Sequence, residues 1–503
     1  MNRSFKHFNM KIKSFASALI GLTLCSACGI KKYTSTMTSL TTTEVKNVVY
    51  SEKEIEQDID YFIKSVEEVS PFPYMKTDSG SIQSLALAKK KKGDRTGKEL
   101  YLDFMELAAA YNVGHIYTFP PEQMLDEAIR NGDRFFPVFL KLNHGKWEIL
   151  GIMSNALPDD FVGNEVKKIN GIPVDDIIKK FLPLFDDERE QTIGASMPFL
   201  VWAADMKSPF SVEIVNKNTG VASVVAVEGT NDLAKYRNKR QDDGQQKLDD
   251  FITFEIRDND TGFINAKSFY FAQSKTVSKA FTKKLDSYFN ELQEKGISNL
   301  IIDLRENGGG SGFPAESILQ RIANKPYRQS GGSTMRVSAQ FRDFIADLPW
   351  VLRMFVKSGP MKDYDKHPVG TNIESETKPT MPKKAKNKFS GQVYVLIGPG
   401  THSAAMMMAN AVEDFDLGIL VGEPTVSIPR ELSNGLPMKT PNARISFIVP
   451  ATLFTRANGD ATNYQPVKPD VVVETTAEDI KNGQDPVMQY VVGKITNEKR
   501  ERK

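Results

Sequence analysis

Ser403 is the residue whose type and setting most directly predict chemistry. It follows the apolar, β-branched run Val393–Ile397 and the turn Gly398-Pro399-Gly400, and it precedes a segment rich in alanine and methionine. That pattern predicts a buried strand, a tight turn and a helix. A serine at such a turn points its hydroxyl out of the sheet, beside the unpaired N–H groups of the helix start. This is the geometry that a nucleophile with an oxyanion hole requires. The alternative is an N-cap serine with no chemical role.

A nucleophilic serine needs a base within hydrogen-bond reach. The chain has five histidines, which are His7, His115, His144, His367 and His402. His402 adjoins Ser403, and adjacent side chains diverge. His7 lies in the basic leader, His144 in a turn and His367 in an irregular segment. His115 follows a glycine at the end of an expected helix, where a side chain can project into a cleft. It is therefore the preferred base by elimination, and a packed or capping histidine is the alternative.

A glycine triplet, Gly308-Gly309-Gly310, follows the expected buried strand Asn299–Leu304. Glycines at such a place let the backbone approach another group closely and point an N–H at it. The triplet lacks the Lys-Ser/Thr of a phosphate loop, so nucleotide binding is not predicted. An ordinary loop is the alternative.

The elements that must position these residues follow one another along the chain. Helical periodicity is seen in Glu52–Val69 and Glu99–Tyr111, short strands flank an Asn170-Gly171 turn, and strands alternate with helices from Phe251 onward. The segments predicted are 1–27, a signal peptide; 28–50, a lipid-anchored flexible tether; 51–125, an N-terminal helical domain that carries His115; 126–248, a β-rich module; 249–476, an α/β domain with an irregular insertion or lid at about 315–390; and 477–503, a helix and charged tail.

The N-terminal segment and the overall charge bear on location. Met1–Ala27 holds four basic and no acidic residues, so the remainder has 61 basic and 63 acidic residues and a net charge of −2. A nucleic-acid partner is therefore not expected. The basic start and short apolar run are typical of a signal peptide. Ser26-Ala27-Cys28-Gly29 resembles a bacterial lipobox, which predicts a lipidated Cys28, a membrane anchor and a location in the periplasm or at the cell exterior. Ordinary signal cleavage is the alternative.

Four ordered motifs carry a resemblance to a known family. They are IIDLRENGGG at Ile301–Gly310, GPGTHSAA at Gly398–Ala405, LVGEPT at Leu420–Thr425 and PVKPDVVV at Pro466–Val473. Together with Gly114-His115 they resemble the serine peptidase family of C-terminal (tail-specific) processing proteases and the tricorn core protease. The resemblance implies an α/β fold with a crotonase-like (ClpP/crotonase-type) β-β-α catalytic core. The β-rich middle module resembles a PDZ domain, and a plain β-rich spacer is the alternative.

The resemblance also implies roles for particular residues. The tail-specific branch uses a lysine about 25 residues after the serine, but Thr425–Arg430 contains none, and arginine does not lose its proton in proteins. Gly114-His115 instead matches the tricorn-like, histidine-base branch. Ser403 is then the nucleophile and His115 the base. The Ala404 N–H would form the oxyanion hole with the N–H of one glycine of the triplet, for which Gly309 is preferred. The family's orienting glutamate is replaced by Asn463.

We therefore expect a membrane-tethered, extracytoplasmic serine endopeptidase that forms an acyl-enzyme and needs no metal or cofactor. Its substrates would be peptides or unfolded protein termini, gripped by strand addition. Two alternatives come from other classes. One is a catalytically silent peptide- or ligand-binding lipoprotein on the same fold, and the other is an acyl-CoA enzyme of the related crotonase-like fold.

Overall fold

The computed structural model describes residues 37, 39–143, 145–153, 157–233, 248–257, 260–270, 275–348, 353, 363–382, 387–476, 479 and 484–501. The predicted signal peptide and Cys28 lie outside these residues, as do His144 and most of the polar segment at 231–248. Among the helices that the model describes, none combines the length and the apolar character needed to span a bilayer.

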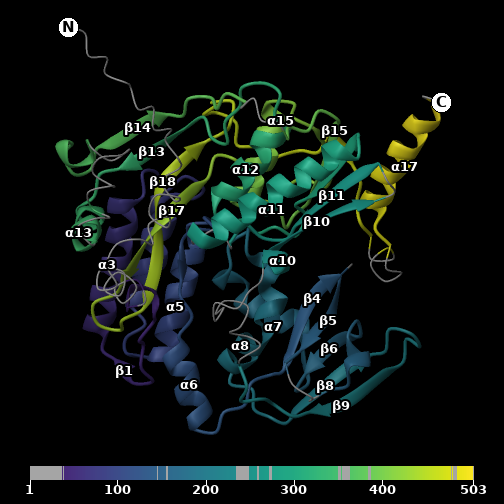
Figure 1. Cartoon of the computed structure of the whole chain (residues 1–503). Coiled ribbons are helices and arrows are strands. Elements are labelled where there is room, and N and C mark those ends of the chain that lie inside the picture. The colour runs from purple at the N-terminus through teal and green to yellow at the C-terminus, as the bar shows by residue number, and fades with distance from the viewer. Residues whose placement is uncertain are drawn as a thin grey trace.

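The C-terminal half of the chain is built on one largely parallel sheet (Figure 1). Its order is β10-β11-β12-β15-β16-β19, with β10 antiparallel at one edge. The bounds are β10 Ile252–Arg257, β11 Thr261–Ala266, β12 Asn299–Asp303, β15 Gln392–Ile397, β16 Ile419–Gly422 and β19 Val471–Val472. Alternating strands and helices predicted an α/β core, and that prediction is confirmed.

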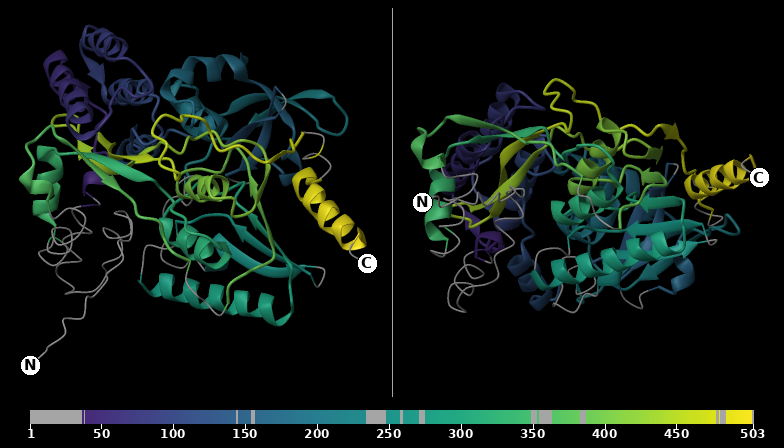
Figure 2. Two further views of the ribbon diagram at one scale, coloured as in Figure 1. Left: turned by 90° about the horizontal axis from the view of Figure 1, so that it is seen from above. Right: turned by 45° about the horizontal axis from the view of Figure 1, so that its top comes forward.

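Both faces of this sheet are buried under helices. Because side chains alternate along each strand, successive residues pack on opposite faces. Leu300 and Ile302 of β12 face a cluster formed with α11, α12 and α15, whereas Ile301 faces the opposite side, against α17. The bounds of the helices are α10 Leu248–Phe251, α11 Lys275–Glu294, α12 Gly312–Ile322, α15 Ala404–Asp414 and α17 Pro486–Glu501. The views in Figure 2 show α17 at the end of the molecule away from the N-terminal helices.

A second sheet corrects the prediction of an irregular insertion at about 315–390. Its order is β14-β13-β18-β17, and the short strand β3 also pairs with β18. The bounds are β3 Tyr117–Thr118, β13 Gly332–Arg336, β14 Asn372–Glu376, β17 Leu432–Lys439 and β18 Ser446–Thr455, with α13 at Ala339–Asp347 and η4 at Tyr364–Lys366. Strands β13 and β14 have only five residues each, and their pairing partners lie from about 40 to more than 100 residues away. Such strands leave little local periodicity, so their pattern was not recognised.

The N-terminal helices pack against the hairpin of this second sheet. Helix α3 begins at Ser51, whose side chain forms a capping box with Glu54, and its predicted bounds are confirmed. The bounds are β1 Val49–Tyr50, α3 Glu52–Val69, α4 Ser79–Lys90, β2 Arg95–Thr96, α5 Gly97–Ala110 and α6 Glu122–Arg130. Phe62 of α3 stands edge-on to Phe447 of β18, with ring centroids 4.9 Å apart.

The middle module is a mostly antiparallel sheet, β4-β5-β6-β8-β9, with β7 paired to β6. The predicted Asn-Gly turn joins β6 to β7, with Asn170 at φ 50° and Gly171 at φ 80°, the signs that a type I′ hairpin turn requires. The PDZ-like interpretation of the module stays a prediction. The bounds are β4 Val138–Asn143, β5 Lys146–Ile152, η1 Asp159–Phe161, β6 Glu165–Ile169, β7 Ile172–Pro173, α7 Val174–Phe181, η2 Leu182–Leu184, η3 Glu190–Ser196, α8 Met197–Ala203, β8 Phe210–Val215 and β9 Ala222–Val227.

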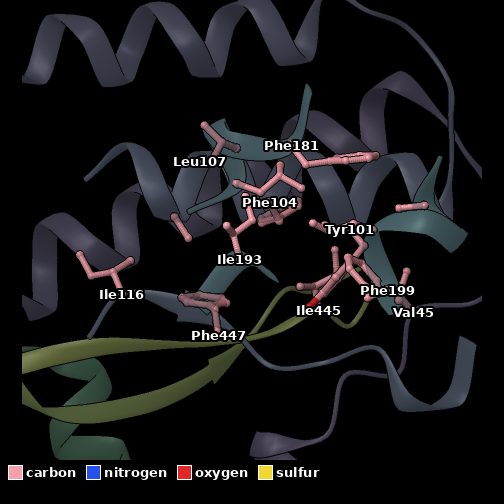
Figure 3. Packing of buried hydrophobic residues seen from close by; sticks show 14 of the residues in the cluster. Val45, Tyr101, Phe104, Leu107, Ile116, Phe181, Ile193, Phe199, Ile445 and Phe447 are labelled. Atoms are coloured by element: carbon pink, nitrogen blue, oxygen red, sulfur yellow. The ribbon is translucent and has the colours of Figure 1, made fainter. Parts of the chain in front are cut away.

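One hydrophobic core joins all three of these parts. Figure 3 shows Phe104 of α5, Phe181 of α7 and Phe447 of the β17–β18 hairpin within one cluster of buried side chains. Burying aromatic side chains of this size contributes about 2 kcal/mol each. The helical domain, the middle module and the C-terminal hairpin are therefore held together by shared apolar packing.

We predict that Asp58 anchors α3 to this hairpin. Its carboxylate is fully buried and accepts the backbone N–H groups of Asn442 and Ala443 at 2.8 and 2.7 Å. Asp58→Asn should destabilise the chain by about 2 kcal/mol, because an amide N–H would face a backbone N–H. Urea unfolding followed by circular dichroism measures this loss.

The matched control lies two residues further along the same helix. Asp60 is 68% exposed and pairs with Lys90 at the surface, so Asp60→Asn should cost less than about 0.5 kcal/mol. Equal losses in the two variants would contradict the anchoring role.

Candidate active site

Ser403 lies at the turn between β15 and α15, as the sequence predicted. Its backbone is strained, with φ 52° and ψ −124°, a conformation that a non-glycine residue adopts only when its surroundings impose it. The turn is held by hydrogen bonds to the segment that follows the neighbouring strand β12. Thr401 Oγ1 donates to the Leu304 carbonyl at 2.8 Å, and the His402 N–H donates to the Asn307 carbonyl at 3.0 Å.

The structure distinguishes the three glycines of the triplet. A Cβ on Gly309 would lie 2.6 Å from Ser403 Cβ and 3.0 Å from the Ala404 nitrogen, and its φ is +92°. A Cβ on Gly310 would instead meet the backbone of Phe269 at 2.4 Å, and one on Gly308 would meet nothing within 4 Å. Only Gly309 is thus in direct contact with the serine turn.

The two predicted oxyanion donors differ in their present bonding. The Gly309 N–H donates to Asn307 Oδ1 at 2.9 Å, and Asn307 is itself buried and donates to the Ala266 carbonyl. An oxyanion would therefore have to replace the Asn307 oxygen. Ala404 is the first residue of α15, and no described residue accepts a hydrogen bond from its N–H.

His115 lies beside the serine turn although it comes from the N-terminal domain. It follows α5 in a loop closed by the Ile116 N–H, which donates to the Val113 carbonyl. Its ring centroid is 5.7 Å from that of His402, and its Nδ1 is 3.4 Å from Glu431 Oε1. Gly114 lies close to another acid, because a Cβ there would be 2.2 Å from Glu188 Oε2.

Asn463, the predicted third catalytic residue, does not make the contact expected of it. Its side-chain oxygen accepts the Gln465 N–H at 2.9 Å in an exposed turn. The adjacent Tyr464 ring stacks under the Arg430 guanidinium, 4.8 Å from its centroid. The carboxylate that faces His115 is Glu431, so in this structure the orienting position belongs to a different residue.

Two residues of the site, Glu188 and Glu431, were missed from the sequence, and a third, His402, was set aside there because it adjoins Ser403. His402 Nε2 lies 2.8 Å from Glu188 Oε2, and Lys76 Nζ lies 2.8 Å from the other oxygen of that carboxylate. Glu431 directly follows the segment in which a lysine was sought, which is the one signal that could have directed attention to it. Neither acid belongs to a motif whose spacing predicts its partner.

The pKa values of the two histidines are shifted in opposite directions. Burial, together with the nearby His402, lowers the pKa of His115 to about 4, so its imidazole is neutral near pH 7. Burial alone would lower the pKa of His402 too, but the hydrogen bond to Glu188 and the charge of Glu431 raise it above the usual value.

The pKa values of the two carboxylates, Glu188 and Glu431, are also shifted in opposite directions. Burial opposes ionisation of Glu188, but the hydrogen bond with His402 and the charge of Lys76 hold its pKa well below the usual range. Burial raises the pKa of Glu431 to about 7. Divergent pKa values in one cluster are typical of catalytic sites.

His115, Glu188 and Glu431 line a small, partly enclosed hollow of about 10 Å³. It is bordered by Met75, Lys76, Val113, Gly114, His115, Glu188, Ile428, Arg430, Glu431 and Leu432. The N-terminal domain, the middle module and the segment that leads into β17 therefore border the same hollow.

Comparison with known proteins shows which protein family this chain resembles. Residues 260–473 match Peptidase family S41. Carboxy-terminal processing protease CtpA of Bacillus subtilis (strain 168) is 25% identical over 277 residues, covering 52% of this chain and 47% of the relative. The chain thus spans about half the length of that curated relative.

Solved structures show the same fold. Mature CPAF superposes with a TM-score of 0.56 at 16% identity, covering 85% of this chain and 94% of that chain. Mature CPAF complexed with lactacystin gives 0.58 at 16% identity, covering 88% and 97%. Fold and sequence are therefore similar to those of serine peptidases of the C-terminal processing type. The resemblance to this family that the sequence predicted is confirmed over residues 260–473.

We predict that Gly309→Ala abolishes most of the activity, because its Cβ would displace the serine turn. The value of kcat/KM on a fluorescent casein should fall by about 100-fold or more. Gly308→Ala keeps the backbone N–H and meets no atom within 4 Å, so kcat/KM should change by less than about threefold. Equal losses would show that the triplet acts only as a flexible loop.

A second prediction separates the two candidate orienting residues. Glu431→Gln should lower kcat/KM by about tenfold or more, because the amide no longer favours the imidazolium of His115. Asn463→Ala should alter it by less than about twofold, since the Asn463 amide bonds only its own turn. The reverse ranking, at equal thermal stability, would restore Asn463 to the orienting role.

Proposed function

We propose that this protein is an exported, lipid-anchored serine endopeptidase with Ser403 as nucleophile and His115 as base. The observation that carries the proposal is the contact of the strained Ser403 turn with Gly309, beside a buried histidine whose pKa is lowered to about 4. A neutral imidazole can accept the serine proton, and hydrogen bonds between catalytic groups often tighten only when substrate is bound.

His115 is preferred over His402 as the base for two reasons. The pKa of His402 is raised and its Nε2 is committed to Glu188 at 2.8 Å, so this ring is less available to take a proton. His115 is the more neutral ring, and it faces Glu431, which can stabilise the imidazolium that forms during reaction.

The proposed reaction proceeds in two steps. Ser403 Oγ attacks the peptide carbonyl carbon while its proton passes to His115, and the oxyanion is stabilised by the Ala404 N–H with the Gly309 N–H. His115 then gives the proton to the leaving amine as the C–N bond breaks. Water, deprotonated by the same histidine, hydrolyses the acyl-enzyme and regenerates the serine.

The proposed substrates are peptides or unfolded protein termini. Their backbone would pair with a strand edge, which reads main-chain groups and tolerates many sequences. Lipidation at Cys28 would tether the enzyme to a membrane facing the periplasm or cell exterior. Cys28 lies outside the described residues, so this part of the proposal is supported by the lipobox alone.

A fluorophosphonate probe tests the nucleophile and its base together. The full chain, kept in detergent because of its predicted anchor, is treated with the probe and its intact mass is measured. We expect one adduct in the wild type, none in Ser403→Ala, and labelling slower by about 100-fold or more in His115→Ala. His367→Asn, a substitution at the histidine directly after η4, should label at the wild-type rate. Lactacystin, which CPAF binds, serves as a second probe.

Two results would overturn the proposal. A folded wild-type chain that gains no adduct would favour the catalytically silent binding lipoprotein. An adduct lost in Ser403→Ala but retained at full rate in His115→Ala would keep the nucleophile and remove His115 as base.

A further inference from the structure

Three side chains from separate parts of the chain form a compact set of metal-ligand donors. Glu188 lies between η2 and η3, His402 lies in the serine turn, and Glu431 directly precedes β17. One donor atom of each lies within 4.8 Å of the other two. This cluster shares a border with the proposed active site, but the mechanism above uses only Glu431 from it.

Glu431 is the observation that points to a ligand. Its side chain is 6% exposed, and both carboxylate oxygens are buried without a hydrogen-bond partner. Lys76, the nearest lysine at the cluster, is committed to Glu188 Oε1. Burying a carboxylate without hydrogen-bond partners is unfavourable. A cation placed among the three donors would remove that cost.

The donor chemistry and spacing select the kind of cation. One imidazole and two carboxylates suit a borderline first-row metal such as Zn²⁺, whereas Ca²⁺ and Mg²⁺ prefer more oxygen ligands. Zinc–ligand bonds of about 2.0–2.2 Å in tetrahedral geometry put the donors about 3.3 Å apart. The shortest separation here, His402 Nε2 to Glu188 Oε2, is 2.8 Å, and the longest is within 4.8 Å. Side-chain shifts of about 1 Å would therefore suffice.

We propose that Glu188, His402 and Glu431 form a Zn²⁺-type metal site that reversibly inhibits the enzyme. Glu188 would contribute Oε2 while Lys76 stays on Oε1, and the fourth position would open toward the hollow that both acids line. Binding would replace the His402–Glu188 hydrogen bond and draw Glu431 away from His115. The site differs from the sequence expectation, which included no metal.

Inhibition follows from electrostatics. With the metal in place, His115 would face a divalent cation rather than a carboxylate, so the imidazolium needed during acylation would be strongly disfavoured. The metal could be displaced by a chelator, which would restore activity. This consequence rests on the proposed function, whereas the existence of the metal site does not.

Binding is measured first, without reference to activity. The full chain is titrated with ZnCl₂ in a calorimeter and with CoCl₂ while the visible d–d absorption is followed. We expect one metal per chain at the cluster, with affinity lowered by about 100-fold or more in Glu431→Gln and in His402→Asn. His367→Asn, which removes a histidine outside the cluster, should bind as the wild type does. Circular dichroism and thermal midpoints confirm that each variant is folded.

Equal binding by the wild type and both cluster variants would place the metal elsewhere and would overturn the site. Absence of binding by the folded wild type would also overturn the site.

Inhibition is then tested by the rate of fluorophosphonate labelling with and without ZnCl₂. Slower labelling that a chelator reverses supports inhibition by the metal. An unchanged labelling rate with the metal bound overturns that inhibition. A chain that never labels would refute the proposed function, while the titrations would still decide the metal site.

Discussion

The close approach of two backbone segments is the constraint on which the candidate site depends. Strands β12 and β15 are adjacent and parallel, with Asp303 opposite Leu396, so the segments that follow them leave the same edge of the sheet. One segment carries Gly309 and the other carries Ser403. Only a glycine leaves room for the contact, and hydrogen bonds from the serine turn to the segment after β12 hold the strained serine in place.

The second sheet determines how the N-terminal domain meets that edge. Tyr117, two residues after His115, pairs with Ile448 of β18, while Glu431 directly precedes β17, the partner strand of β18. A single sheet therefore brings the histidine and the carboxylate into the same cleft. The shared hydrophobic core behind it, with Phe447 packed among the helices, makes this arrangement rigid.

The charges in the cleft are costly for folding and useful for function. Glu188 is satisfied by Lys76 and His402, but Glu431 is buried with neither oxygen hydrogen-bonded. Buried groups of this kind are rare in structural positions, because hydrophobic replacements of similar shape are usually more stable. Their concentration beside the serine turn is what an active site requires, and it is also what makes the same cleft attractive to a cation.

The sequence by itself determined the local elements of this protein. The strand, turn and helix around Ser403, helix α3 and the Asn170-Gly171 hairpin follow from periodicity, capping and turn chemistry, which act over a few residues. The ordered motifs were enough to indicate the S41 family and its α/β core. Each of these signals lies within a short stretch of chain.

Only the tertiary structure decided which side chains meet. It brought Glu188, His402 and Glu431 to His115, left Asn463 in an exposed turn, and built β13 and β14 into a sheet where an irregular insertion was expected. These contacts join residues far apart in the chain, and their geometry depends on packing across several domains. A single sequence encodes such contacts without displaying them, because no local spacing distinguishes a buried carboxylate from a solvated one.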